Sequence, residues 1–388
     1  MPRVMRVLTR PNVGGPTRQM VALWHAFAEL GWQTLLVVGQ CEDEPAVDLR
    51  AEGVPQIAPE AVNVNSAGFV VVSMLRRGVH PVRDALARWR LGQLMRAFAP
   101  DVVHTHTSKA GALARSVARQ QEIGVVAHTF HGHVLQDYFG RWRAWLVRGA
   151  ERYLARGTHL LFAVSPSCRE ELAALGVARA ERIAVVPPAV DVRRFVGGSR
   201  MRAREELGVA ADAFVLGFVG RLVEVKRPRL FADLVARVPD AIGLVFGDGP
   251  LRSELEGAPR VRLLGATDRL PAWLVACDAL VFTSVREGCP LAAVEAFAAG
   301  VPVVGLAVPG VQDVLEEWGA GVLVPPEQGV DGLVAACASL KDTDRAAKLV
   351  ATAKASVSRF EPLAVARALM SHYEPAMVAA AADQDECV

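Results

Sequence analysis

The stretch "DALVFTSVREGCPLAAVEAFAAGVPVVG" (residues 278–305) holds the pattern that decides the fold. It contains a short apolar run, a polar turn, an alanine-rich helical pattern and a second apolar run. Two buried strands joined through a helix are typical of a parallel sheet. Glu287 lies in the turn and Glu295 lies eight positions later, so the stretch also raises the question of what two fixed carboxylates bind.

The same alternation runs through most of the chain. Helical patterns such as residues 17–30 and 108–121 separate several of the apolar runs. Runs typical of short buried strands occupy residues 3–9, 32–39, 101–106, 124–130, 159–165, 182–188, 213–220, 241–249, 261–267, 278–284, 301–307 and 320–326. This spacing predicts an α/β protein with parallel sheets and helices on both faces of each sheet.

A break in the pattern separates two series of strands. Pro187 and Pro188 precede the polar stretch "VDVRRFVGGSR" (residues 190–200), where we place the domain boundary. We therefore expect an N-terminal domain over residues 1–190 and a C-terminal domain over residues 200–360, both doubly wound and Rossmann-like. Ligands of such domains bind outside the carboxyl ends of the strands, in this case in the crevice between the domains.

Composition excludes several classes of protein. A net charge of +2 gives no strong field for nucleic acid. The six cysteines form no C-x-x-C pair, which favours a reducing compartment. The N-terminus lacks the apolar core of a signal peptide, and every apolar run is shorter than the roughly 18 residues of a membrane span. We predict a soluble, cytoplasmic protein.

Two cations follow the first strand of the second series. Arg221 and Lys226 come after the run at 213–220, and fixed cations there suit an anion such as a phosphate or diphosphate. Two solvated surface charges are the alternative interpretation.

A second anion site is predicted in the opening stretch. Pro290 suits the first turn of a helix that runs to about residue 299, so residues 288–292 present unpaired backbone N–H groups. Glu287 lies just before this helix and Glu295 about 7.5 Å along its axis. The carboxylates would accept hydrogen bonds from the sugar and the ribose of a sugar nucleotide. The alternative is a plain helix with one exposed glutamate.

These residues carry a resemblance. The motifs "GRLVEVKRP", "VFGDGPLRSELE", the opening stretch and the early "HTHTSKAGALAR" resemble a retaining glycosyltransferase of family 4, over about residues 1–375. The family has the type-B fold (GT-B), in which two Rossmann-like domains face each other across a cleft. A helix over residues 361–380 crosses back to the N-terminal domain in that fold.

The resemblance implies roles for the donor-side residues. Arg221 and Lys226 would hold the diphosphate of a nucleotide sugar, and Glu295 the ribose hydroxyls. Glu287 would contact the transferred sugar. Backbone amides of the following turn would help, and this turn comprises Gly288, Cys289, Pro290, Leu291 and Ala292. Enzymes of this kind need no metal or other cofactor. The chain departs from the family at Pro309, Gly310 and Asp313, where a Gly-Gly pair and a glutamate are common.

The resemblance also selects residues of the N-terminal domain. Gly14 and Gly15 form a loop that lies near the donor phosphates and the acceptor in the family. His131 matches a histidine that reaches toward the transferred sugar, with His133 as a competitor. From their position near the end of a predicted strand, and not from the resemblance, His106 and Lys109 are further candidates for contact with acceptor or phosphate. By contrast, His128 falls within a strand pattern and is expected in the core.

The segment 138–157 mixes arginines with aromatic side chains. One interpretation is a helix that docks on anionic membrane, at the inner face, to reach a lipid-linked acceptor. The other is a surface helix whose aromatic side chains face the core.

We expect a hexosyl or N-acetylhexosaminyl group to move from a nucleotide sugar, UDP-linked by preference, to an alcohol with retention of configuration. The acceptor would be a small molecule, a glycan or a lipid-linked sugar. Alternatives are a UDP-sugar 2-epimerase of the same fold and a non-catalytic paralogue that binds nucleotide sugars.

Overall fold

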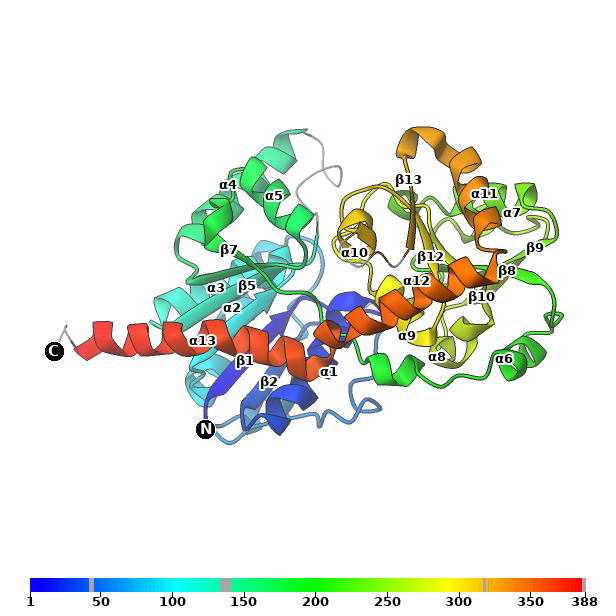
Figure 1. Cartoon of the computed structure of the whole chain (residues 1–388). Helices are drawn as coiled ribbons and strands as arrows, with labels where there is room; N and C mark the ends of the chain where they lie inside the picture. Colours follow the sequence, from blue (N-terminus) through cyan, green and yellow to red (C-terminus); the bar gives the residue numbers. More distant parts are fainter. Residues whose placement is uncertain (42–44, 133–140, 317–318, 320, 386–388) are drawn as a thin grey trace. The chain divides into compact units, whose positions relative to one another are not determined.

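The computed structural model describes residues 1–41, 45–132, 141–316, 319 and 321–385, with residues 141–144 and 383–385 described by their backbone alone. The chain forms two compact units (Figure 1). Unit 1 runs from Met1 to Ala189 and resumes at Pro362, and unit 2 runs from Val190 to Glu361. The chain therefore passes between the units twice.

Unit 1 is built on a parallel sheet of seven strands in the order β3-β2-β1-β4-β5-β6-β7. The strands are β1 (Arg3–Leu8), β2 (Gln33–Val38), β3 (Gly68–Val71), β4 (Val102–His106), β5 (Val125–Phe130), β6 (Leu160–Ala163) and β7 (Ile183–Val185). Its helices are α1 (Gly15–Glu29), α2 (Pro81–Phe98), α3 (Ser108–Gln120), α4 (Arg141–Arg156), α5 (Pro166–Ala174) and α13 (Pro362–Asp385).

Helices cover both faces of this sheet, which is why its strands are apolar on both sides. On one face, Met5 and Val7 of β1 share a core with α2 and α3. On the other face, Val4 of β1 packs with α1 and α13. Neighbouring residues of one strand thus enter two separate cores.

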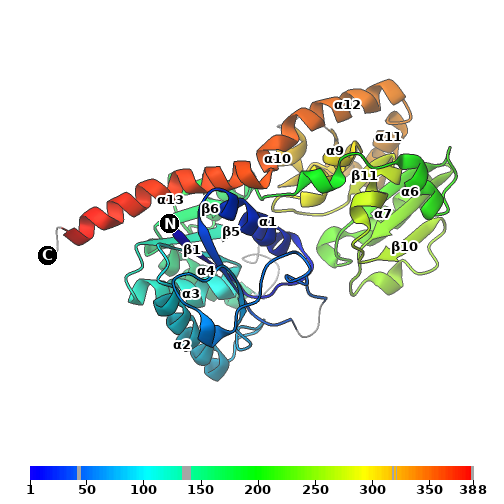
Figure 2. The same ribbon diagram turned by 90° about the horizontal axis from the view of Figure 1, so that it is seen from below.

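The C-terminal helix α13 belongs to the core of unit 1. Its residues Val365, Leu369 and Tyr373 are buried with Phe27 of α1, and α13 lies alongside α1 (Figure 2). The rings of Phe27 and Tyr373 stack with their centroids 6.2 Å apart. The final segment of the chain therefore completes a domain that begins at its N-terminus.

Unit 2 is built on a parallel sheet of six strands in the order β10-β9-β8-β11-β12-β13. The strands are β8 (Phe214–Val219), β9 (Ala241–Phe246), β10 (Val261–Gly265), β11 (Ala279–Phe282), β12 (Val303–Leu306) and β13 (Gly321–Val324). The helices are α6 (Arg200–Glu206), α7 (Pro228–Arg237), α8 (Leu270–Trp273), α9 (Leu291–Ala299), α10 (Val311–Glu316), α11 (Gly329–Ser339) and α12 (Thr343–Ser356).

The structure confirms each predicted strand and adds β3, which the sequence analysis did not identify. This strand has four residues and lies at the edge of its sheet, paired only with β2 among the strands. Helix α9 begins at Leu291, with Pro290 as its N-cap rather than its first residue. Among the described residues, no helix has both the length and the apolar content that crossing a membrane requires.

Candidate active site

Lys226 and Glu287 lie in direct contact in unit 2. Nζ of Lys226 donates to Oε1 of Glu287 at 2.5 Å, and Oγ of Ser284 donates to the same oxygen at 2.6 Å. The Lys226 side chain is 22% exposed and the Glu287 side chain 10%. Solvent therefore screens this pair less than it screens an exposed pair of charges.

The sheet topology explains why these residues meet. β8 and β11 are parallel neighbours, so the loops after them leave the same edge of the sheet. Thr283, directly after β11, donates to the carbonyl oxygens of Lys226 (2.8 Å) and Arg227 (3.1 Å). The N–H of Val285 donates to the Val225 carbonyl at 3.0 Å. The β11 loop thus fixes the turn that carries Lys226.

The loop after β12 contacts the backbone of Glu287. The Glu287 N–H donates to the carbonyl of Pro309 at 3.0 Å. Gly310 has φ +80°, and a Cβ atom there would lie 2.3 Å from the Glu287 carbonyl oxygen. These are the positions where the chain departs from the common family pattern, and here they hold the backbone of a predicted site residue.

The N-terminus of α9 has no side-chain cap. Its first backbone N–H groups and the positive end of the helix dipole can therefore act on an anion. Gly288, Cys289, Leu291 and Ala292 are each partly exposed around it. The predicted second anion site comprises these residues.

The other two donor-side residues differ in burial. Glu295 is only 5% exposed, so the alternative of a plain helix with an exposed glutamate is wrong. Arg221 is exposed and follows β8 closely, two residues after Val219.

In unit 1, Gly14 is the N-cap of α1, which begins at Gly15 rather than near Thr17. The Gly14 backbone is extended, with φ 175°, and a Cβ atom would meet only the Asn12 side chain at 3.8 Å. The backbone conformation therefore does not itself require glycine at position 14. The N-terminus of α1 also has no side-chain cap.

Two of the predicted histidines are in contact. His106 ends β4 and His131 follows β5, and Nδ1 of His106 lies 2.8 Å from Nε2 of His131. His128 is buried and pairs with the Thr105 hydroxyl at 2.7 Å, which confirms its place in the core. His133 lies outside the described residues.

Burial keeps these histidines neutral at neutral pH. Loss of solvation lowers the pKa of His131 to about 4, with the buried Arg6 cation adding to the effect. The pKa of His106 lies well below its usual value, first because of burial and then because of the neighbouring His104. At neutral pH both rings are therefore neutral and interact through hydrogen bonds rather than through charge.

Lys109 forms an ion pair with a carboxylate of its own unit. Its Nζ lies 2.6 Å from Oδ1 of Asp84 and also contacts the Gly78 carbonyl. A role in binding phosphate would require this ion pair to open.

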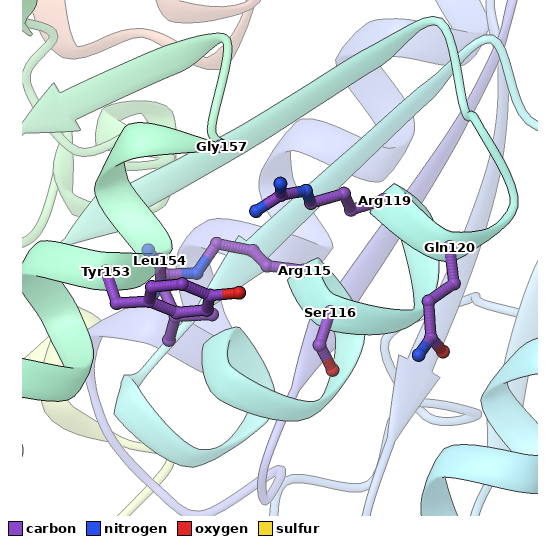
Figure 3. A pocket seen from close by; sticks show the side chains of 7 residues that line it. All are labelled: Arg115, Ser116, Arg119, Gln120, Tyr153, Leu154 and Gly157. Atoms are coloured by element: carbon purple, nitrogen blue, oxygen red, sulfur yellow. The ribbon is translucent and has the colours of Figure 1, made fainter.

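A cavity of about 270 Å³ lies elsewhere in unit 1 (Figure 3). Its lining residues are Arg115, Ser116, Arg119, Gln120, Tyr153, Leu154 and Gly157. Arg115, one of these lining residues, forms a buried ion pair with Glu151 at 2.5 Å. None of the predicted site residues lines this cavity, so it is not the candidate active site.

Sequence reasoning missed Thr283 and Ser284. Both are buried hydroxyl residues directly after a buried strand, at the edge where ligands of parallel sheets bind. Their position directly after a predicted strand is the feature by which the sequence could have identified them. Asp342 caps α12 by accepting from the N–H groups of Asp344 (3.0 Å) and Arg345 (3.2 Å).

Comparisons with known proteins identify the family of the chain. The family model of glycosyltransferase family 4 matches residues 13–194, and that of glycosyl transferases group 1 matches residues 213–342. A galactosyltransferase of Escherichia coli, UDP-Gal:alpha-D-GlcNAc-diphosphoundecaprenol alpha-1,3-galactosyltransferase, is 29% identical over 60% of this chain and 64% of its own length. The 2-deoxystreptamine N-acetyl-D-glucosaminyltransferase of Streptomyces fradiae is 30% identical over 67% of each chain. The chain thus aligns with about two thirds of the length of these curated relatives.

Solved structures show the same fold. HepE of Anabaena, solved with UDP and glucose, superimposes with a TM-score of 0.77 at 19% identity, covering 97% of this chain and 100% of that one. Sucrose-phosphate synthase of Thermosynechococcus elongatus gives a TM-score of 0.79 at 21% identity, with 98% and 100% covered. Two parallel sheets with these neighbours define the two-domain α/β fold of glycosyltransferases, GT-B. Within that class, the chain belongs to glycosyltransferase family 4, the group 1 glycosyl transferases.

Proposed function

We propose that this chain transfers a hexosyl or N-acetylhexosaminyl group from a nucleotide sugar to an alcohol, with retention at the anomeric carbon. The observation that carries the proposal is the contact of Lys226 and Ser284 with Glu287 beside the uncapped N-terminus of α9. A cation and a helix N-terminus suit the diphosphate, and a largely buried carboxylate suits sugar hydroxyls.

UDP is the proposed nucleotide. The name of the Escherichia coli relative specifies UDP-galactose, and HepE was solved with UDP. Glu295 would bind the ribose hydroxyls, and Arg221 would join Lys226 at the diphosphate. The acceptor would be a small molecule, a glycan or a lipid-linked sugar, since the relatives' names include both a diphosphoundecaprenol-linked sugar and 2-deoxystreptamine.

The proposed reaction exchanges one bond at the anomeric carbon for another. The bond to the diphosphate oxygen breaks as the acceptor oxygen forms a bond on the same face of the sugar. The acceptor proton passes to the departing diphosphate oxygen. Lys226, Arg221 and the N-terminus of α9 would stabilise the diphosphate charge without a metal. His131 would donate to a sugar hydroxyl, and Glu287 would contact the transferred sugar.

Incubation of the full chain with a panel of nucleotide sugars tests this proposal. We expect slow hydrolysis of one UDP-sugar, and faster consumption with a cell extract that supplies the acceptor, whose product mass spectrometry would identify. The Lys226→Ala variant serves as the inactive control. Isomerisation of the donor without release of sugar would instead indicate the epimerase. Binding without turnover under every condition would indicate the non-catalytic paralogue.

We further propose that unit 1 contacts anionic membrane through α4. Trp145 and Tyr153 are 70% and 64% exposed, so the alternative interpretation, with aromatic side chains in the core, is wrong for these two residues. Leu146 is exposed between them. Helix α4 carries five arginines against one glutamate, which suits an anionic lipid surface.

Helix α2 is a second candidate for this contact. It presents a stripe of exposed apolar side chains, Val82, Leu86 and Trp89, on the face opposite its buried residues. Helix α3 packs against both α2 and α4, so the three helices lie on one side of unit 1 (Figure 2). An exposed apolar stripe next to arginines is typical of a helix that lies in the membrane interface.

Vesicle flotation tests the membrane proposal. We expect binding to vesicles with phosphatidylglycerol, weaker binding to pure phosphatidylcholine, and loss of binding in Trp145→Ser/Leu146→Ser. The matched control is Val378→Ser, which removes an exposed apolar side chain of α13. Equal binding by the double variant and the control variant would contradict the proposal.

A further inference from the structure

His106 differs from the residues expected to touch a ligand. Its side chain is fully buried at the end of β4, and its Nδ1 atom lies 2.8 Å from Nε2 of His131. Its other ring nitrogen, Nε2, is buried and makes no hydrogen bond within the described part of the chain. A side chain enclosed in this way can act on a substrate only through His131.

The direction of the bond between the two histidines follows from the unpaired nitrogen. The contact needs one proton, which either ring can supply when both are neutral. If His131 were the donor, His106 would carry its proton on Nε2 and bury an N–H group without an acceptor. Buried N–H groups without an acceptor are rarer in proteins than buried acceptors without a donor, and each costs about 1–3 kcal/mol. The favoured arrangement is donation from Nδ1–H of His106 to Nε2 of His131.

The neighbouring His104 fixes the plane of the His106 ring. The two rings stack with centroids 4.4 Å apart and an interplanar angle of 26°. Nε2 of His104 lies 2.7 Å from the Thr129 hydroxyl, and Nη2 of Arg6 lies 3.2 Å from Nδ1. Because arginine can only donate, Nδ1 of His104 accepts and its Nε2–H donates to Thr129.

The C-terminal helix anchors the same network. The Tyr373 hydroxyl of α13 contacts Nδ1 of His104, and its ring packs edge-on against the His104 ring. The order of contacts is therefore Tyr373, His104, His106 and His131, from a buried core toward a partly exposed ring.

We propose that His106 is a positioning residue that fixes the tautomer and the orientation of His131. By donating to Nε2, it leaves the proton of His131 on Nδ1, where the ring can donate a hydrogen bond to the transferred sugar. The inference rests on the proposed function of His131. It goes beyond that function because it assigns the tautomer, and it removes His106 from the residues that contact a ligand.

A pair of substitutions separates positioning from a merely structural role. In His106→Asn, the side-chain amide nitrogen can take the place of Nδ1 and donate to His131. In His106→Leu, the volume is similar but no donor is present. We expect the leucine variant of the full chain to lose about tenfold or more in kcat, as loss of a hydrogen bond worth roughly 1.4 kcal/mol predicts, with UDP affinity within about twofold of wild type. The asparagine variant should recover most of this loss.

A matched control and a spectroscopic measurement complete the test. His128→Leu removes another buried histidine of the same sheet and should leave kcat per folded molecule unchanged. Nitrogen-15 NMR of the wild-type chain should show the proton of His131 on Nδ1, and His106→Leu should shift it toward Nε2. An unchanged kcat in His106→Leu, or no recovery in a folded His106→Asn, would overturn the inference. So would a wild-type His131 protonated on Nε2. A wild-type chain without transferase activity would refute the proposed function instead, and the NMR measurement would still decide the tautomer.

Discussion

Lys226 and Glu287, 61 positions apart in the sequence, share one short contact of 2.5 Å between Nζ and Oε1. The sequence analysis assigned them to different ends of the donor, Lys226 to the diphosphate and Glu287 to the sugar. The contact means that the two roles are coupled, because a substitution of either residue leaves the charge of the other without its partner. Because both side chains are largely buried, this uncompensated charge has its own energetic cost.

The first prediction follows from this coupling. Lys226→Ala should weaken UDP binding about ten- to a hundredfold, because a charge-assisted contact with the diphosphate is lost. Glu287→Gln should bind UDP at least as well as wild type, because a neutral amide replaces the carboxylate that competes with the diphosphate for Lys226. The same variant should turn over more slowly. Calorimetry with UDP and rate measurements on the same preparations would show this. Equal loss of UDP affinity in both folded variants would contradict the assignment of the two ends.

The second prediction concerns the loop behind Glu287. Gly310→Ala should lower turnover, because its Cβ atom would collide with the Glu287 carbonyl oxygen and displace the carboxylate. The left-handed backbone alone costs an alanine about 1–2 kcal/mol. Gly257→Ala is the matched control, since Gly257 of the same unit has nearly the same φ (+82° against +80°) but has no atom within 4 Å of the added Cβ.

Both glycine variants should lose similar stability from the backbone term, which thermal unfolding would report. Only Gly310→Ala should lose activity per folded molecule. If the two variants kept the same activity, the loop would not determine the position of Glu287.

The strands of both sheets could be predicted from the sequence because parallel strands buried on both faces are continuous apolar runs. β3 escaped notice because its run, Phe69–Val72, is short and follows a loop of polar and small residues. The residues of the candidate donor site, Arg221, Lys226, Glu287 and Glu295, could be proposed from the sequence because they follow predicted strands.

The contacts within the site could not be predicted from the sequence. Spacing places Lys226 and Glu287 after two strands, but only the order of strands in the sheet makes those strands neighbours. The contact of His106 with His131 depends in the same way on the pairing of β4 with β5. For α4, periodicity alone could not decide which side of the helix is buried, and the aromatic side chains of Trp145 and Tyr153 face solvent.

The third prediction concerns α13. Ending the chain after Glu361 would remove Leu369 and Tyr373 from the core of unit 1 and expose the apolar face around Phe27. We expect the shortened chain to expose β1 and β5 to rapid hydrogen exchange and to lose activity, although every predicted site residue remains. Ending the chain after Asp385 instead should change neither property. An active shortened chain with protected β1 and β5 would contradict the role of α13.

The last prediction is a loss of stability in mild acid. His104, His106 and His128 have pKa values well below the usual value, and that of His131 is lowered to about 4, chiefly because burial disfavours the charged ring. The cations nearest to them, Arg6 and Arg115, add to this effect. In the unfolded chain the same histidines titrate near pH 6.5. Below that pH the unfolded state therefore binds more protons than the folded state, so the free energy of unfolding falls as the pH falls from about 6.5 toward 4.

Each such histidine contributes a slope of about 1.4 kcal/mol per pH unit within this window, and no slope above it. Urea unfolding at several pH values would measure the slope. His106→Asn should reduce this slope by about 1.4 kcal/mol per pH unit, which is the contribution of one histidine, because asparagine does not titrate. An unfolding free energy that stayed constant between about pH 6.5 and 5, or an unchanged slope in His106→Asn, would show that these rings take up protons in the folded state and are not the neutral hydrogen-bonding groups that the site requires.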